Sequence, residues 1–196
     1  MIEYSYLPLT YLNMTILIIT GIALFLLIGS ILTYNQLVKK RNLMKEGWSG
    51  IDVYLKKRYD LIPNLIETVK GYATHEQQLM ENITRLRSNA IQSSNTTEKI
   101  LAENGLTQSV GQLMILAENY PDLKANTNFQ QLQSQLETIE SEIEMSRRYY
   151  NGTVRENNIL IESFPSNLLA AAFSFKQGSF FEIQNPEERG NQKASF

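Results

Sequence analysis

The polar residues whose spacing best suits chemistry are Asp60, Asn64 and Glu67, with Lys56 one helical turn before them. If these residues lie on one helix, steps of four, four and three place them all on the same face. Such a face could hold a divalent cation or act as an acid–base pair. Ca²⁺ requires six or more oxygen ligands, however, and this set supplies them only across chains. We therefore prefer the interpretation that these side chains form hydrogen bonds and charge pairs between helices.

The composition and local spacing also argue against cysteine-, histidine- and serine-based catalytic sites. The 196 residues include no cysteine and one histidine, which excludes disulfides, thiolate nucleophiles and multi-histidine metal sites within one chain. His75 and Glu76 do not begin an HExxH motif, because residue 79 is leucine. Ser49 and Ser166 have no His or Lys partner in an arrangement that would activate a nucleophile. We predict that the protein is not an enzyme and has no catalytic residue, cofactor or metal ion.

Residue types that suit protein interfaces occur at two further places. Arg147, Arg148 and Tyr149 are consecutive, and Arg and Tyr are enriched among the residues that dominate binding energy. Half-exposed positions of a helical bundle explain this run equally well. Trp48 is the only tryptophan, and core packing is its default role. The candidate packing and interface residues are Trp48, Asp60, Asn64, Glu67, Arg147, Arg148 and Tyr149.

A long apolar stretch must position these residues relative to a membrane. Residues 11–34 read YLNMTILIITGIALFLLIGSILTY, and no charge occurs between Glu3 and Lys39. The hydrocarbon core of a bilayer is about 30 Å thick and needs about 20 apolar residues, which residues 14–32 supply. A cleaved signal peptide would have a basic start and a shorter apolar part. We predict a single transmembrane helix at 11–34, with Tyr11 and Tyr34 at the two interfaces.

The charges that flank this helix predict its orientation. Lys39, Lys40 and Arg41 follow the span, and no positive side chain precedes it. The positive-inside bias places residues 1–10 outside and the residues after about 36 in the cytoplasm. Lys39, Lys40 and Arg41 are close enough to the bilayer to contact anionic headgroups. The predicted membrane-interface residues are Tyr11, Tyr34, Lys39, Lys40 and Arg41.

A second basic run, Lys56, Lys57 and Arg58, lies about 20 residues beyond the span, or about 30 Å along a straight helix. That distance exceeds the roughly 10 Å reach of membrane electrostatics. We expect this run to pair with acidic helix faces or with a neighbouring subunit.

The chain after the span has the apolar periodicity of a helical bundle. Steps of three, four and seven from Leu37 to Ile62 predict that one helix leaves the bilayer and enters the domain without a flexible linker. Pro63 either kinks this helix or begins a second one capped by Asp60. The apolar stripe then resumes and continues to Leu86, with Gly71 tolerated inside it.

Turn signals divide the remainder into two more long helices. Residues 88–97 are polar and predict a loop, with Asn95 and Glu98 as a capping pair. One helix then runs to about Tyr120, before Pro121, and the last carries apolar residues from Phe129 to Ile161 and ends near Phe164 and Pro165. The fold class predicted is all-α, a transmembrane helix running into an antiparallel, four-helix-type bundle over 35–183. Residues 184–196 are expected to form a flexible tail.

Several segments resemble the LemA family of bacterial membrane proteins, in the same order and behind a single apolar span. They are YNQLVKKRN, EGWSGIDVYLKKRYDLIPNLIETVKGYATHE, LAENYPDLKANTNF, LQSQLETIESEIEMSRRYYNGTVRENN and FPSNLLAAAFSFKQGSFFE. The resemblance implies a short external N-terminus, one membrane helix and a helical-bundle domain in the cytoplasm. The chain departs from the usual family residues at three positions: Gly47 stands where the family usually has Ala, Asn157 where it has Tyr, and Ser174 where it has Gly. The resemblance implies no settled molecular function.

Three functions remain open at the level of the sequence. The first, which we favour, is a membrane-anchored scaffold that self-associates as a homo-oligomer or docks a protein partner. The second is a membrane sensor or regulator that relays a signal from the span through the continuous helix, with Pro63 as a hinge. The third is a carboxylate- or metal-dependent enzyme built around Asp60 and Glu67. The lipid bilayer is an expected partner, whereas a net charge of -2 does not favour nucleic acid.

Overall fold

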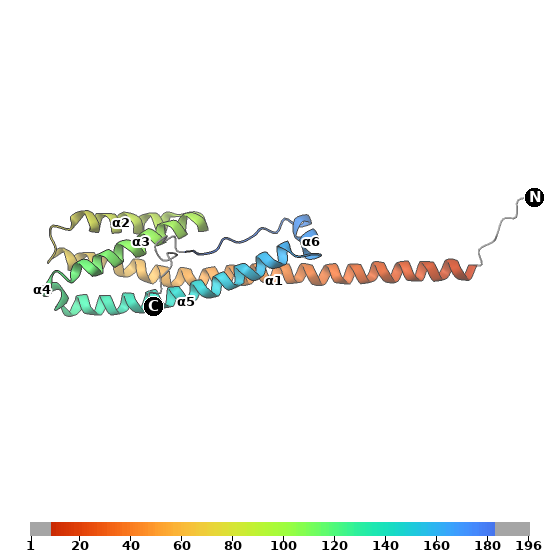
Figure 1. The fold of residues 1–196 in the computed structure, drawn as a ribbon, viewed down its shortest axis with the longest axis horizontal. Helices are drawn as coiled ribbons and strands as arrows, with labels where there is room; N and C mark the ends of the chain where they lie inside the picture. Colours follow the sequence, from red (N-terminus) through yellow and green to blue (C-terminus); the bar gives the residue numbers. More distant parts are fainter. Residues whose placement is uncertain (1–8, 183–196) are drawn as a thin grey trace, which may run out of the picture. The chain divides into compact units, whose positions relative to one another are not determined.

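The structure is a computed structural model that describes residues 9–182, with side chains from residue 13 onward. This part of the chain is helical and contains no strand (Figure 1), which confirms the predicted all-α class. Residues 1–8 of the predicted external N-terminus and the predicted tail at 184–196 lie outside it. The helices in order are α1 Leu9–Lys70, α2 Gln77–Gln92, α3 Thr96–Ala117, α4 Pro121–Lys124, α5 Thr127–Glu162 and α6 Ser166–Ala172.

The chain divides into two compact units. Among the described residues, the first unit comprises 9–43 and 156–177, and the second comprises 44–155 and 178–182. Because α1 and α5 are long, each of them contributes residues to both units.

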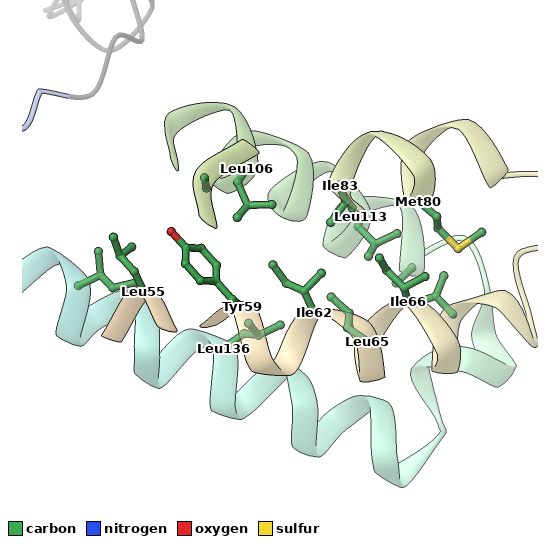
Figure 2. Close-up of a cluster of buried hydrophobic side chains, with 14 of the residues drawn as sticks. Leu55, Tyr59, Ile62, Leu65, Ile66, Met80, Ile83, Leu106, Leu113 and Leu136 are labelled. Carbon is green, nitrogen blue, oxygen red and sulfur yellow. The ribbon is translucent and has the colours of Figure 1, made fainter. Parts of the chain in front are cut away.

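The second unit is an antiparallel bundle. Its portions of α1 and α5 pack with α2 and α3, and successive long helices alternate in direction (Figure 1). Apolar side chains from all four helices meet in its core, among them those in Figure 2. Burying one large aliphatic side chain contributes about 1.5–3 kcal/mol, so this shared core is the main source of the bundle's stability. The labelled residues of the core are Leu55, Tyr59, Ile62, Leu65, Ile66, Met80, Ile83, Leu106, Leu113 and Leu136.

The helix α1 is continuous through Pro63. Proline has no N–H group, so the carbonyl of Tyr59, four residues earlier, loses its usual intrahelical donor. Arg87 on α2 replaces that donor, since its Nε lies 2.7 Å from the Tyr59 carbonyl oxygen. Of the two outcomes left open at Pro63, the start of a second helix is therefore wrong.

Three predicted boundaries of the bundle helices are wrong. First, α1 ends at Lys70, and residues 71–76 form a turn before α2, where a continuing apolar stripe was expected. Gly71 lies at this point and lowers helix propensity. Second, α2 extends to Gln92, so the connection to α3 is shorter than the loop predicted at 88–97. Third, α3 ends at Ala117, and Pro121 begins the short helix α4.

Two other local predictions for the bundle are confirmed. The side chain of Asn95 caps α3 by accepting a hydrogen bond of 2.8 Å from the Glu98 N–H. The last long helix, α5, spans Thr127–Glu162, close to the predicted range. The capping bond satisfies a backbone donor that the first turn of any helix leaves without a partner.

The first unit contains the N-terminal part of α1, the end of α5 and α6. From Met14 to Leu32 the large apolar side chains of α1 are exposed. In the described part of the chain, α1 is the one helix long and apolar enough to cross a membrane, judged by length and composition. Beyond this stretch, Lys40 forms a 2.6 Å ion pair with Glu156 of α5.

The helix α6 ends in a left-handed turn. Ser174 has φ of 56°, a conformation that favours glycine. The Ser174 N–H donates to the Ala171 carbonyl at 3.2 Å, and the Phe175 N–H donates to the Ala170 carbonyl at 2.9 Å. This pair of bonds is the Schellman arrangement. It brings Phe173 and Phe175 against Tyr34, with ring centroids 4.8 and 5.9 Å away.

Candidate functional site: a buried charge cluster

A cluster of charged side chains lies inside the bundle of the second unit. Arg58 of α1 occurs three residues after Leu55 and four before Ile62, so it shares the face that the core requires. Only 1 % of its surface is exposed. Glu103 of α3 is fully buried and lies three residues before Leu106. The two side chains form an ion pair in the interior.

Hydrogen bonds extend this pair to a third helix. Arg58 Nη1 donates to Glu140 Oε2 of α5 at 2.8 Å and to Thr107 Oγ1 of α3 at 2.8 Å. The hydroxyl of Tyr59 donates to the other oxygen of Glu103. The cluster therefore ties α1, α3 and α5 together, and Glu140, whose side chain is 39 % exposed, is its connection to solvent.

Burial and charge both shift the titration of this cluster. Burial by itself lowers the pKa of Arg58, but the charges and hydrogen bonds of Glu103 and Glu140 outweigh it, so its pKa lies above the usual value. Burial, together with the negative charge of Glu103, also raises the pKa of Tyr59. Arg58 is thus charged and Tyr59 neutral throughout the physiological range. These groups are suited to holding helices together rather than to exchanging protons.

A second arginine lies in the interior of the same unit. Arg147 of α5 is buried, with its guanidinium carbon 4.2 Å from the centre of the Phe181 ring. Burial, followed by the positive charge of Arg58, lowers the pKa of Arg147. Trp48 packs edge-on to Tyr150 at 5.4 Å and lies 6.0 Å from Phe181. Two predicted interface residues, Trp48 and Arg147, therefore meet around a residue from the C-terminal segment.

The other predicted interface residues lie on the outside of the bundle. Asp60, Asn64 and Glu67 are exposed on α1, which continues through all three as the shared-face argument requires. Arg148 and Tyr149 are exposed on α5, and Arg148 pairs with Glu144 at 3.4 Å. Across the described residues with side chains, no three His, Asp or Glu residues lie close enough together to hold a metal ion.

The predicted membrane-interface residues lie in the first unit. Tyr34 contacts the two phenylalanines that flank Ser174, and the guanidinium of Arg41 lies 5.1 Å from the centre of the Phe175 ring. Lys39 is exposed, and Lys40 is half-buried in its pair with Glu156. The side chain of Tyr11 lies outside the described part.

Sequence reasoning expected Arg58 to pair with an acidic helix face, and it does so with Glu103 and Glu140. It did not find Tyr59, Glu103, Thr107 or Glu140. The spacing of residues in α3 could have revealed Glu103, because Ile100, Glu103 and Leu106 are three residues apart and share the buried face. Glu103 and Ser109 are polar residues on the buried face of α3, and they weaken its apolar periodicity.

A surface groove of about 320 Å³ opens beside the buried cluster. Arg58, Thr107 and Glu140 form its polar side, and Val110, Met114 and Leu136 form its apolar side. An apolar side chain that carries a hydrogen-bond donor would fit this combination. The remaining lining residues are Gly111, Gln133 and Glu137.

The sequence model of the LemA family matches residues 47–196. A similar protein is "Protein LemA" of Metamycoplasma hominis, 25% identical over 168 residues that cover 85% of this chain and 75% of that protein. Two others are "Magnetosome protein MamQ 2" of Paramagnetospirillum magneticum, 21% identical, and "Magnetosome protein MamQ" of Magnetospirillum gryphiswaldense, 20% identical. These matches cover 78% and 77% of this chain, which spans 65% of the length of each MamQ protein.

Proposed function

The chain belongs to the LemA family, and from that premise we propose that it is a membrane-anchored helical-bundle scaffold without catalytic activity. In this role it self-associates or docks a protein partner at the membrane. The helix α1 carries the proposal, because one uninterrupted helix contains both the exposed apolar stretch and core residues such as Leu55 and Ile62. A helix of that kind joins an anchor to a bundle without a flexible linker.

The buried cluster supports a structural role. Arg58 and Glu103 neutralise one another, and their hydrogen bonds link three helices. A general acid or base needs a pKa near the operating pH and access to a substrate. Arg58 has neither property, since its pKa is raised and its side chain is buried.

The surfaces for assembly in this proposal are the exposed faces of the bundle. Asp60, Asn64 and Glu67 present one polar face on α1, and Arg148 and Tyr149 present another on α5. The groove that Glu140 and Leu136 help to line adds a pocket, with one polar and one apolar side, for a side chain of a partner. Substitutions of the five residues on the two polar faces should change assembly without lowering stability, because their side chains are exposed.

The proposal includes a location and an orientation. The protein is anchored in the bacterial inner membrane, with its N-terminus outside and the bundle in the cytoplasm. The support is the basic group Lys39, Lys40 and Arg41, which directly follows the apolar stretch.

The test of self-association is the mass of the full-length protein in mild detergent, measured by light scattering, with particle shape from electron microscopy. A protein that begins at Asn35 is measured beside it. An oligomer of fixed size in the full-length sample is the expected result. A monomer in both samples would contradict self-association, and cross-linking in membranes would then test for a protein partner.

One observation favours a second candidate, a membrane sensor or regulator. The carbonyl of Tyr59 receives its hydrogen bond from Arg87 because Pro63 cannot supply it. A point of α1 whose bonding depends on another helix could switch between two arrangements. In this model Pro63→Ala abolishes signalling, whereas a scaffold with the same substitution only becomes stiffer and assembles normally.

A further inference from the structure

The helix α6 and its flanks expose large apolar side chains within the first unit. Phe164, Leu168 and Phe173 are 80 %, 63 % and 58 % exposed. Soluble surfaces rarely gather apolar groups of this size without an interaction partner. Residues 163–177 of this unit also contain no Asp or Glu and one positive residue, Lys176. This segment therefore has the composition of a membrane-facing surface rather than of a solvated one.

The same segment adjoins the end of the candidate span. The ring of Phe173 packs edge-on against Tyr34, two residues beyond Leu32, the last large exposed apolar residue of the stretch. The apolar surface of α1 is therefore continuous with that of the α6 segment inside one unit. If α1 crosses a bilayer, Phe173 lies at the depth where aromatic residues collect, near the headgroups.

Positive charges accompany these aromatic rings. The guanidinium of Arg41 lies over Phe175, and Lys39 and Lys176 are exposed. Aromatic rings combined with Lys or Arg suit an anionic headgroup region, where apolar stems stay in the boundary and charges reach the phosphates. A two-fold contact between copies of this surface would instead bring like charges together.

We propose that the α6 segment, residues 164–176, is a second membrane contact that inserts into the headgroup boundary beside the span. The occupant of the surface is the bilayer itself, containing anionic lipid. An amphipathic segment of this kind buries its apolar side roughly 5–10 Å into the boundary. The inference rests on the proposed anchoring by α1, and it adds a shallow contact to the deep one.

The experiment measures how deeply single tryptophans insert. Trp48 is replaced by Phe, which leaves the full-length protein without tryptophan, and Leu168→Trp or Phe164→Trp is introduced. The protein is reconstituted in vesicles of phosphatidylcholine and phosphatidylglycerol. The lipids carry bromine either near the headgroup or near the chain end. We expect both tryptophans to be quenched, and more strongly by the shallow bromine than by the deep one.

Two control positions separate this inference from the proposed anchoring. Phe25→Trp, at an exposed position in the middle of the apolar stretch, should be quenched more strongly by the deep bromine. Ile115→Trp, at a 69 % exposed position on α3 of the second unit, should not be quenched. If it is quenched as strongly as position 168, exposed tryptophans adsorb nonspecifically and the inference fails.

Three outcomes are decisive. Quenching at 164 and 168 by the shallow bromine, with Phe25→Trp quenched by the deep one, supports both contacts. Quenching at position 25 alone leaves the anchor in place and overturns the second contact. A blue-shifted but unquenched emission at 168 would then mean that a second copy or a partner protein covers it. No quenching at any position overturns the anchoring and the inference together.

Discussion

At the scale of the residue, Arg58 and Glu103 show how a bundle accommodates two charges away from water. Removing a charged group from water costs several kcal/mol, and a buried pair offsets this only with good geometry and additional hydrogen bonds. Here Thr107, Tyr59 and Glu140 supply those bonds. The pair therefore makes a smaller net contribution to stability than its position suggests, but the loss of one partner is costly.

The first prediction concerns the cost of removing one partner of this pair. Arg58→Met leaves Glu103 buried without its counter-charge and should lower the free energy of unfolding by about 3–5 kcal/mol. Adding Glu103→Gln should restore part of the loss. Urea unfolding followed by Trp48 fluorescence reports it, because Trp48 packs in the same unit. Arg148→Met is the matched control, since its exposed pair with Glu144 is worth less than about 1 kcal/mol. Equal losses at Arg58 and Arg148 would contradict the prediction.

The second prediction concerns the pH dependence of stability. The pKa of Tyr59 is raised in the folded state, so the folded protein holds this proton more tightly than the unfolded chain does. Stability from Tyr59 is fully present below the unfolded pKa of about 10 and falls as the pH rises above it. Tyr59→Phe should lose about 1–3 kcal/mol at pH 7, because Glu103 loses a donor.

Urea unfolding of both proteins at pH 7 and above pH 10 measures this effect. The difference between the native protein and Tyr59→Phe should shrink at the higher pH. A difference that stays constant over the range would show that Tyr59 does not contribute through its proton.

The third prediction concerns Ser174. Its φ of 56° lies in the left-handed region, where an L-residue is less stable than glycine by roughly 1–2 kcal/mol. Ser174→Gly should therefore raise the thermal stability of the first unit by up to about 1 kcal/mol, after the greater unfolded-state entropy of glycine is deducted. Ser163→Gly, at an exposed position in the connection between α5 and α6 where φ is not positive, is the control and should not stabilise the protein. A melting curve of the full-length protein in detergent measures both.

At the scale of the element, Pro63 is tolerated inside α1 because Arg87 of α2 supplies the hydrogen-bond donor that proline lacks. The fourth prediction is that Arg87→Ala destabilises the bundle by about 1–3 kcal/mol, since the Tyr59 carbonyl loses its donor. Pro63→Ala should reduce this loss when added, because alanine supplies an N–H. The coupling is measured with a double-mutant cycle in urea. Arg85→Ala, at an exposed arginine of the same helix, should have little effect.

The predictability of the elements varied with the clarity of their sequence signals. The capping residue Asn95 and the extent of α5 could be predicted because each depends on local chemistry. The continuity of α1 at Pro63 could not, because it depends on Arg87, 24 residues later. The charge cluster was missed for a related reason. Glu103 has a polar side chain on a buried face, and only its partners on other helices explain its position.

At the scale of the whole molecule, topology is the property with the most direct test. The fifth prediction is that Ser5→Cys reacts with a membrane-impermeant thiol reagent in intact cells. Ser141→Cys, at an exposed position on α5, should react only after lysis. The native chain has no cysteine, so the labelling is specific to the introduced residue. The opposite pattern would reverse the orientation inferred from Lys39, Lys40 and Arg41.

The bond between Arg87 and the Tyr59 carbonyl also has a consequence for the order in which the chain folds. The backbone of α1 around Pro63 lacks one of its stabilising bonds until α2 packs against it. These two helices are neighbours in sequence and leave the ribosome before α3 and α5. Their pairing should therefore be an early folding event, with α1 and α2 forming a hairpin on which the later helices assemble. During synthesis, the backbone of α1 around Pro63 would then gain its missing hydrogen bond only after α2 has left the ribosome.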